Sequence, residues 1–200
     1  MYMLHLISKQ KGFTLIEVLL VIAVIGIVST AAISSYVDST RTFTFFERYQ
    51  AVIGAIRSAR SEAVTSKQVN FNGELVRPDY YGVNFAKNNT DYKITVFADV
   101  GSKPLEFDNT DVVQKEINLK DPYAMTFTNM SNLSLEWPLN IFYETETGNV
   151  ESYSKGLLLD YLKNKYYTLK FEDKNKGISK YIVLFQVSGL AEEFVTAPSL

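Results

Sequence analysis

The sequence predicts an α+β protein in which one long N-terminal helix precedes a head of antiparallel β-sheet. Two observations lead to this class. From Phe13 to about Lys67 the apolar residues either run together or recur at helical spacing, and after Pro78 short β-branched and aromatic segments alternate with turn sequences. The 13 Tyr and 13 Phe also suit an aromatic-rich sheet better than a disordered tail.

The first half of the expected helix is apolar enough to cross a membrane. Residues 13–33 form one apolar run, and about 20 such residues span the hydrocarbon core as a helix. Lys9 and Lys11 precede the run, which predicts a cytoplasmic N-terminus and a head outside the cytoplasm. We therefore expect a leader at 1–12, a transmembrane helix at 13–36, an amphipathic continuation at 37–68 and a β-rich head at 69–200.

The second half of the expected helix carries one apolar face, which we expect to pack on the sheet. Its members recur at three- and four-residue spacings: Phe45, Phe46, Tyr49, Val52, Ile53, Ile56, Ala59 and Ala63. Between the two halves, residues 34–44 are rich in Ser and Thr. Because these side chains compete for backbone hydrogen bonds, we expect the helix to loosen there.

The head is predicted from seven segments of strand-like composition. They are Tyr81–Ala86, Tyr92–Ala98, Val112–Leu119, Met125–Thr128, Asn140–Tyr143, Lys165–Glu172 and Tyr181–Ser188. Turn sequences at Thr147–Asn149 and Asn175–Gly177 separate some of these segments. Trp137 is expected to cover the core rather than to bind a ligand.

Glu17 is the one acidic residue in the apolar run. A charge in a membrane helix is costly and requires a partner. Cleavage after Gly12 would supply one, because the new α-amine of Phe13 would have a pKa of about 8 and be largely cationic. That amine and the Glu17 carboxylate of an offset neighbouring subunit would neutralise each other. A secretory signal and an uncleaved anchor are the competing interpretations, and the anchor leaves Glu17 unexplained.

The stretch KGFTLIEVLLVIAVIGIV, residues 11–28, resembles the class III signal of type IV prepilins and type II secretion pseudopilins. The resemblance implies a pilin-like fold, cleavage by prepilin peptidase between Gly12 and Phe13, N-methylation of Phe13, and a role for Glu17 in subunit pairing. Lys9 and Lys11 are then the basic residues of the leader. Major pilins of this family often carry a proline later in the segment, but here the first proline is Pro78.

The same resemblance implies partners and a location. The partners are prepilin peptidase, other pilin or pseudopilin subunits, an inner-membrane assembly platform and, before assembly, membrane lipid. The chain is then a single-pass protein of the bacterial inner membrane with its head on the periplasmic side, or part of an extracellular fibre once assembled into a pilus.

The expected end of the helix, IRSARSEAVTSKQ at residues 56–68, is similar to minor pilins grouped with pseudopilin H, FimT and FimU. This implies a structural minor subunit of a pilus or of a secretion pseudopilus, and the sequence does not decide between the two. The alternative is a FimT-like minor pilin that binds DNA for natural transformation. The C-terminal sequence GLAEEFVTAPSL has no Lys or Arg, whereas residues 163–180 are rich in Lys, so nucleic acid is a disfavoured but open partner.

The composition disfavours an enzyme. The chain has no cysteine, and His5 is its one histidine, which removes the usual general base, thiolate nucleophile and zinc ligands. We identify no catalytic residue, metal or cofactor, and a membrane-tethered enzyme is the least favoured alternative.

Two polar groups outside the apolar run allow more than one interpretation. Asp108, Asn109 and Asp111 could supply oxygens to calcium, but their spacing fits no EF-hand and an ordinary polar loop is the simpler interpretation. Arg57 and Arg60, with the nearby Glu62, mark either a subunit contact or a solvated helix face.

Overall fold

The computed structural model describes residues 12–101, 105–129, 134–154, 157–158, 165–186 and 188–196. The chain divides into two units, residues 1–44 and residues 45–200. A single helix, α1 (Leu15–Val64), contains the boundary between them. The expected long helix is therefore confirmed, with ends that differ from the expected ones by a few residues.

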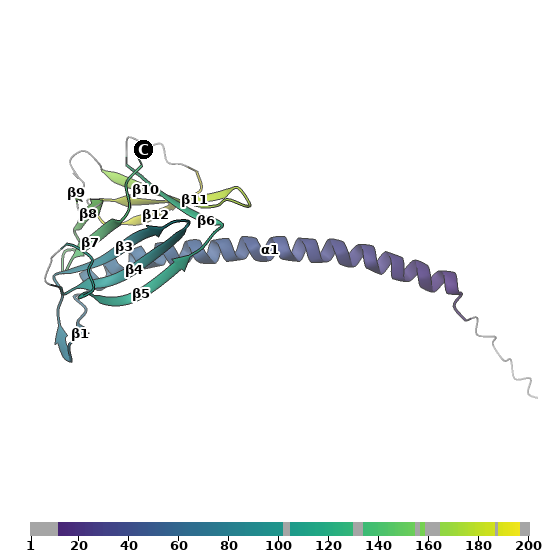
Figure 1. The fold of residues 1–200 in the computed structure, drawn as a ribbon, viewed down its shortest axis with the longest axis horizontal. Helices are drawn as coiled ribbons and strands as arrows, with labels where there is room; N and C mark the ends of the chain where they lie inside the picture. The colour runs from purple at the N-terminus through teal and green to yellow at the C-terminus, as the bar shows by residue number, and fades with distance from the viewer. Residues whose placement is uncertain are drawn as a thin grey trace, which may run out of the picture. The chain divides into compact units, whose positions relative to one another are not determined.

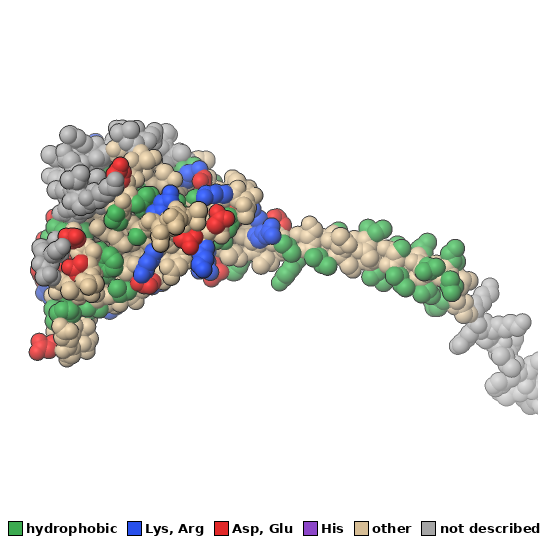
Figure 2. All heavy atoms as spheres, viewed as in Figure 1, with side chains coloured by type: hydrophobic (Ala, Val, Ile, Leu, Met, Phe, Trp, Pro, Cys, Tyr) green, Lys and Arg blue, Asp and Glu red, His purple; other side chains and the backbone are tan. Residues whose placement is uncertain are grey.

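The first unit consists, in its described part, of the N-terminal half of α1. Every residue from Gly12 to Arg41 is exposed, and apolar side chains make up much of this surface (Figure 2). The helix is continuous through residues 34–44, so the expectation that it loosens there is wrong for this structure. The hydroxyl groups of Thr40 and Thr44 donate to the carbonyl oxygens of Tyr36 and Thr40, at 2.9 and 3.0 Å, and leave the helical backbone bonds in place.

The second unit begins with the C-terminal half of α1, whose buried residues agree closely with the expected apolar face. They are Phe45, Tyr49, Val52, Ile53, Ala55, Ile56, Ala59 and Ala63. Phe46 is the exception, because it is 42% exposed and the ammonium group of Lys180 lies 5.5 Å from its ring centroid. A cation over an aromatic face is a favourable arrangement at the surface, so Phe46 belongs to the rim rather than to the core.

Two antiparallel sheets form most of the head (Figure 1). The six-stranded sheet has the order β5 (Val112–Leu119), β4 (Asp91–Asp99), β3 (Tyr80–Asn88), β7 (Leu139–Glu144), β8 (Val150–Ser154) and β9 (Leu157–Leu158). The four-stranded sheet has the order β12 (Ala191–Phe194), β11 (Ile178–Phe185), β10 (Tyr166–Asp173) and β6 (Tyr123–Asn129). All seven predicted strands are present, which confirms the α+β class.

A short hairpin follows α1 and projects from the head (Figure 1). Its strands are β1 (Val69–Phe71) and β2 (Glu74–Val76), which pair with Phe71 opposite Glu74. The two connecting residues, Asn72 and Gly73, both have positive φ angles, of 54° and 91°. This is the backbone that an Asn-Gly hairpin turn requires.

One hydrophobic core joins the helix to both sheets. The ring of Phe45 lies 5.3 Å from that of Phe171 on β10, and Phe85 of β3 meets Phe127 of β6 edge to face at 4.9 Å. Trp137 packs against this core at its edge, 5.4 Å from the ring of Tyr92 and 5.8 Å from that of Phe127. Its expected role as a cover of the core is thus what the structure shows.

Candidate processing and assembly site

The first turn of α1 is closed by a reciprocal pair of hydrogen bonds between Thr14 and Glu17. The backbone N–H of Thr14 donates to Oε2 of Glu17 at 2.8 Å, and the backbone N–H of Glu17 donates to Oγ1 of Thr14 at 3.3 Å. The Thr14 hydroxyl also donates to the same carboxylate oxygen, at 2.9 Å. This is a capping box, in which the Glu17 side chain satisfies the N–H of Thr14, while the N–H of Glu17 is shared between Oγ1 of Thr14 and the carbonyl oxygen of Thr14, 3.1 Å away.

The capping box changes how Glu17 is understood. Sequence reasoning treated it as a charge awaiting a partner on another subunit, and missed that Thr-Leu-Ile-Glu is itself a capping-box sequence. The cap holds the carboxylate beside the backbone nitrogen of Thr14, one residue from Phe13. Glu17 therefore lies at the end of the helix where an α-amine would form if the chain were cut before Phe13.

The two residues at the expected cleavage junction are accessible. Phe13 is 88% exposed, and a Cβ atom built on Gly12 would meet no other heavy atom within 4 Å. The described structure thus gives no packing reason for glycine at position 12. Lys9 and Lys11, the expected basic residues of the leader, lie outside the described residues.

The apolar part of α1 is long and apolar enough to cross a membrane, and none of its apolar window is buried inside the protein. Large apolar side chains are exposed along its whole length, among them Leu15, Ile25 and Ile27. A continuous apolar surface of this kind marks contact with lipid or with other protein. At the N-terminus of the chain, it fits a membrane anchor.

The arginines near the end of α1 are held within the head. Arg57 donates from Nε and Nη2 to the carbonyl oxygen of Ala191, at 3.3 and 3.1 Å, and Arg60 donates from Nε to the carbonyl oxygen of Ser188 at 3.1 Å. Glu62 pairs with Lys67 at 3.2 Å. Both arginines thus connect the helix to the turn before β12 and its first residue, a contact between residues 128 to 134 positions apart that sequence could not reveal.

The acidic loop before β5 forms a backbone-bonded turn. Asp111 accepts hydrogen bonds from the N–H groups of Val100, Gly101 and Asp108, and Asp108 accepts one from the N–H of Thr110. Among the described residues, no group of three His, Cys, Asp or Glu side chains is placed to hold a metal ion. These contacts account for Asp108 and Asp111 as loop residues, the simpler of the two interpretations.

Comparison with known proteins identifies the class of the N-terminal segment. Residues 7–33 match the family described as the prokaryotic N-terminal methylation motif, a span that contains Gly12, Phe13 and the capping box. The segment is therefore a type IV pilin-like signal, as its sequence resemblance suggested, and the helix-and-sheet architecture of the chain is pilin-like.

The particular relatives are fimbrial. Two curated proteins of Pseudomonas aeruginosa, each named fimbrial protein, are 32% identical to this chain over 81 residues. The match covers 40% of this chain and 52% of each relative, so the chain spans about half the length of the curated relatives it matches. No solved structure matches the chain significantly. These similarities do not separate the subgroup of pseudopilin H, FimT and FimU from other pilins.

Proposed function

We propose that this protein is a structural minor subunit of a type IV pilus or of a type II secretion pseudopilus. Prepilin peptidase cuts between Gly12 and Phe13, removes residues 1–12 and methylates the new amine of Phe13. The observation that carries the proposal is the position of the methylation motif, which lies on an exposed apolar helix whose first turn is closed by Thr14 and Glu17.

The proposed mechanism is mechanical. Before assembly, the apolar helix, residues 13–36, resides in the inner membrane with the leader in the cytoplasm and the head on the other side. During assembly, helix–helix contacts with other pilin or pseudopilin subunits replace its lipid contacts at the assembly platform. Glu17 pairs with the amine of Phe13 on an adjacent subunit, so that neither charge is buried alone. The capping box supports this role because it holds the carboxylate at the helix end.

Intact-mass measurement of the protein from its native host tests the proposal. We expect loss of residues 1–12 and one added methyl group on Phe13. Recovery of the full-length chain alone, in cells with an active prepilin peptidase, would contradict the proposal.

The DNA-uptake alternative gains no support from the described surface. Lys170 is paired with Glu172, and Lys174 lies 3.9 Å from Asp121. Basic and acidic side chains are interspersed on the visible face of the head (Figure 2). Because duplex DNA binding depends on a continuous field of unpaired cations, we expect a dissociation constant no tighter than about 10⁻⁴ M at physiological salt. A fluorescence anisotropy titration that gave low-micromolar binding with a steep salt dependence would favour the alternative.

A further inference from the structure

A hollow of about 280 Å³ lies along the last turns of α1 and carries two arginines. Its lining consists of Arg57, Arg60, Ser61, Val64, Thr65, Gly189, Leu190 and Ala191, called here the arginine groove. The volume falls just below the usual range for small-molecule pockets, which begins at about 300 Å³. The groove is therefore large enough to accept a protruding side chain of another protein.

The groove is held in shape by the backbone. Both guanidinium groups are bonded to main-chain carbonyl oxygens, those of Ala191 and Ser188. Gly189 has a φ of +66°, and a Cβ there would lie only 2.7 Å from Val150 and 3.0 Å from Tyr143. A side chain at position 189 would therefore collide with residues of β7 and β8, so the turn between Ser188 and Ala191 requires glycine here.

The hydrogen-bonding capacity of the groove is not used up. Within the described residues, the one hydrogen bond of Arg60 is made by Nε, so both of its terminal nitrogens are without an acceptor. The ion pair of Arg57 with Glu193 is long, at 3.7 Å, and solvent-exposed, so it contributes little. Val64 and Leu190, 42% and 45% exposed, add apolar surface beside these donors. The groove thus fits a carboxylate next to an apolar or aromatic side chain.

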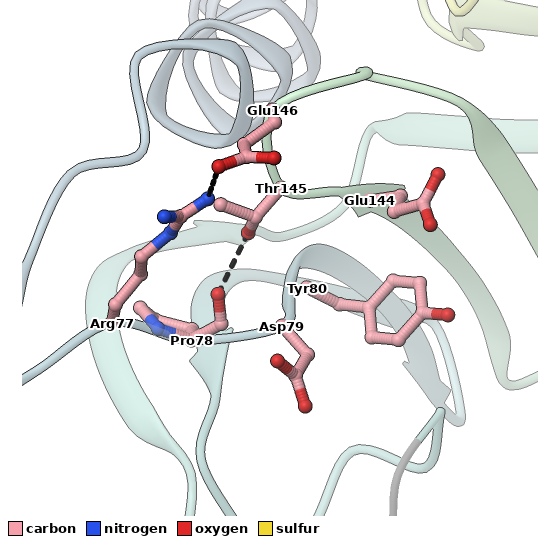
Figure 3. Close-up of a pocket in the computed structure, with 7 residues that line it drawn as sticks. All are labelled: Arg77, Pro78, Asp79, Tyr80, Glu144, Thr145 and Glu146. Atoms are coloured by element: carbon pink, nitrogen blue, oxygen red, sulfur yellow. Dashed lines mark hydrogen bonds and ion pairs between the residues drawn. The ribbon is translucent and has the colours of Figure 1, made fainter.

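The same chain carries a surface of that description on its head. Figure 3 shows the side chains of Asp79 and Glu144 on either side of Tyr80, next to the ion pair of Arg77 with Glu146. Asp79 is exposed, and its carboxylate has no hydrogen bond or ion pair among the described residues. Burial and then the charges of Glu151, Glu144, Asp79 and Asp99 raise the pKa of Tyr80, which indicates a negative local potential.

We propose that the arginine groove of one copy of this chain binds the Asp79–Tyr80 surface of a second copy. Asp79 meets the free nitrogens of Arg60, and the Tyr80 ring contacts Val64 and Leu190. Since donor and acceptor surfaces differ, the contact is heterologous and repeats along a fibre rather than closing a dimer. Nucleic acid is a poorer occupant because Glu193 flanks the groove and would repel a row of phosphates. The proposal rests on the proposed function, which places subunits side by side.

Photocrosslinking tests the contact in the full, processed chain. Because the chain has no cysteine, Ser61→Cys introduces a single thiol into the groove for a benzophenone label. Labelled protein from mixed ¹⁴N and ¹⁵N cultures should form crosslinked dimers in membranes or sheared fibres. Mass spectrometry should place the crosslink on residues 77–80 of the other isotopic copy. The same label on Asn88→Cys, at the exposed end of β3, is the matched control and should not reach that segment.

Charge variants then test whether Asp79 of one copy pairs with Arg60 of the other. Asp79→Lys or Arg60→Asp should each lower the labelled dimer about tenfold, a ratio that corresponds to ~1.4 kcal/mol. The double variant should recover most of it. Asp79→Asn checks for misfolding, since the Asp79 side chain makes no hydrogen bond or ion pair with the described part of the head, and it should also weaken the dimer. Processed protein that forms no dimer, that crosslinks elsewhere or to another protein, or that is unaffected by the charge variants would overturn this contact. Unprocessed protein would instead overturn the proposed function.

Discussion

The two units of the chain differ in whether their apolar side chains are exposed or buried. In the first unit, the apolar side chains from Phe13 to Val37 are exposed. In the head, apolar side chains such as Phe45, Phe85 and Phe171 are buried in a core between α1 and the two sheets. The head can therefore stabilise itself in water by burying its own apolar surface. The described part of the first unit is a single helix, and none of its apolar window is buried within the chain.

This difference shows that the residues of the head are constrained by folding, whereas those of the first unit are constrained by what the helix contacts outside the chain. Substitutions in the head should change the free energy of unfolding, since each buried side chain has many neighbours. Substitutions in the first unit should leave folding unchanged and act on what the helix contacts outside the chain. Each of the following experiments changes one unit and measures both properties.

The largest effect is expected at the junction before the helix. Gly12→Val should abolish processing in the native host, because a branched side chain crowds the backbone where the peptidase must approach. Folding should be unaffected, since there is open space around Gly12. Gly26→Val in the same unit, also with no neighbour within 4 Å of its Cβ, is the matched control and should be processed normally. Intact mass reports the outcome, and cleavage of the Gly12→Val chain would count against the assignment of the junction.

The next effect is expected at Glu17. Glu17→Ala should insert into the membrane more easily than wild type, yet fail to enter the fibre, because it leaves the amine of a neighbouring Phe13 unpaired. Glu17→Gln separates charge from capping, since Gln can still close a capping box, and it should fail as well. Glu17→Asp should be partly active. Thr14→Ala weakens the cap by about 1 kcal/mol but keeps the charge, and should still assemble.

Membrane-fraction and sheared-fibre levels of these variants measure the two steps separately. The melting temperature of the head should be the same in all of them. If both Glu17→Ala and Glu17→Gln entered fibres normally, the carboxylate would have no role in subunit pairing.

A glycine pair sharpens the same comparison inside the head. A Cβ on Gly82 of β3 would lie 2.3 Å from the ring of Phe97, so Gly82→Ala should destabilise the head by about 1–3 kcal/mol through overpacking. Gly26→Ala places the same methyl group in open space and should leave the melting temperature unchanged. Near-ultraviolet circular dichroism of the full chain in detergent follows the aromatic core in both. Equal melting temperatures would show that the strand shifts to accommodate the methyl group.

The smallest effect is expected from Asp99, which is 6% exposed. Burial, opposed by a hydrogen bond from the N–H of Leu105 and assisted by the charges of nearby aspartates, raises its pKa from 3.8 to about 6. A raised carboxyl pKa means that the folded head binds this proton more tightly than the unfolded chain does. The stabilisation is therefore complete below pH 3.8 and is lost as the pH rises through about 6.

Replacing the Asp99 carboxyl group should reveal this loss of stability as a difference between measurements at two pH values. Asp99→Asn removes the buried charge and keeps an oxygen for Leu105, so it should stabilise the head by on the order of 1–2 kcal/mol at pH 8 and by less at pH 4. Asp91→Asn, at the exposed first residue of β4, is the control. Thermal melts at both pH values check the sign, and a larger gain at pH 4 would contradict it.

The sequence predicted the parts of this molecule that depend on local patterns. The long helix, its buried face and seven strands follow from periodicity and composition. Two further local signals, the Asn-Gly pair at residues 72–73 and the capping-box sequence at residues 14–17, also correspond to observed structure, although neither was among the predicted elements. β12 was missed because Glu192 and Glu193 occupy the middle of a four-residue edge strand, where pairing with β11 outweighs composition.

The candidate sites divide in the same way. The junction at Gly12 and Phe13 is a short linear motif, and such motifs are legible in a sequence. The bonds of Arg57 and Arg60 to carbonyl groups near β12 depend on how the chain returns to the helix after more than a hundred residues. A sequence shows that these arginines are on a polar face, but not which backbone groups they meet there.

The threonine hydroxyls along α1 have a consequence for how this helix changes surroundings. Thr30 donates to the carbonyl oxygen of Gly26 at 2.9 Å, just as Thr40 and Thr44 donate to carbonyls one turn earlier. Each hydroxyl proton is thus satisfied by the helix that carries it, whatever lies outside. A segment with this property can leave lipid, slide past a neighbour and settle among other helices without breaking a hydrogen bond at any stage. These threonine hydroxyls therefore need no new hydrogen-bond acceptor when the surroundings of the helix change.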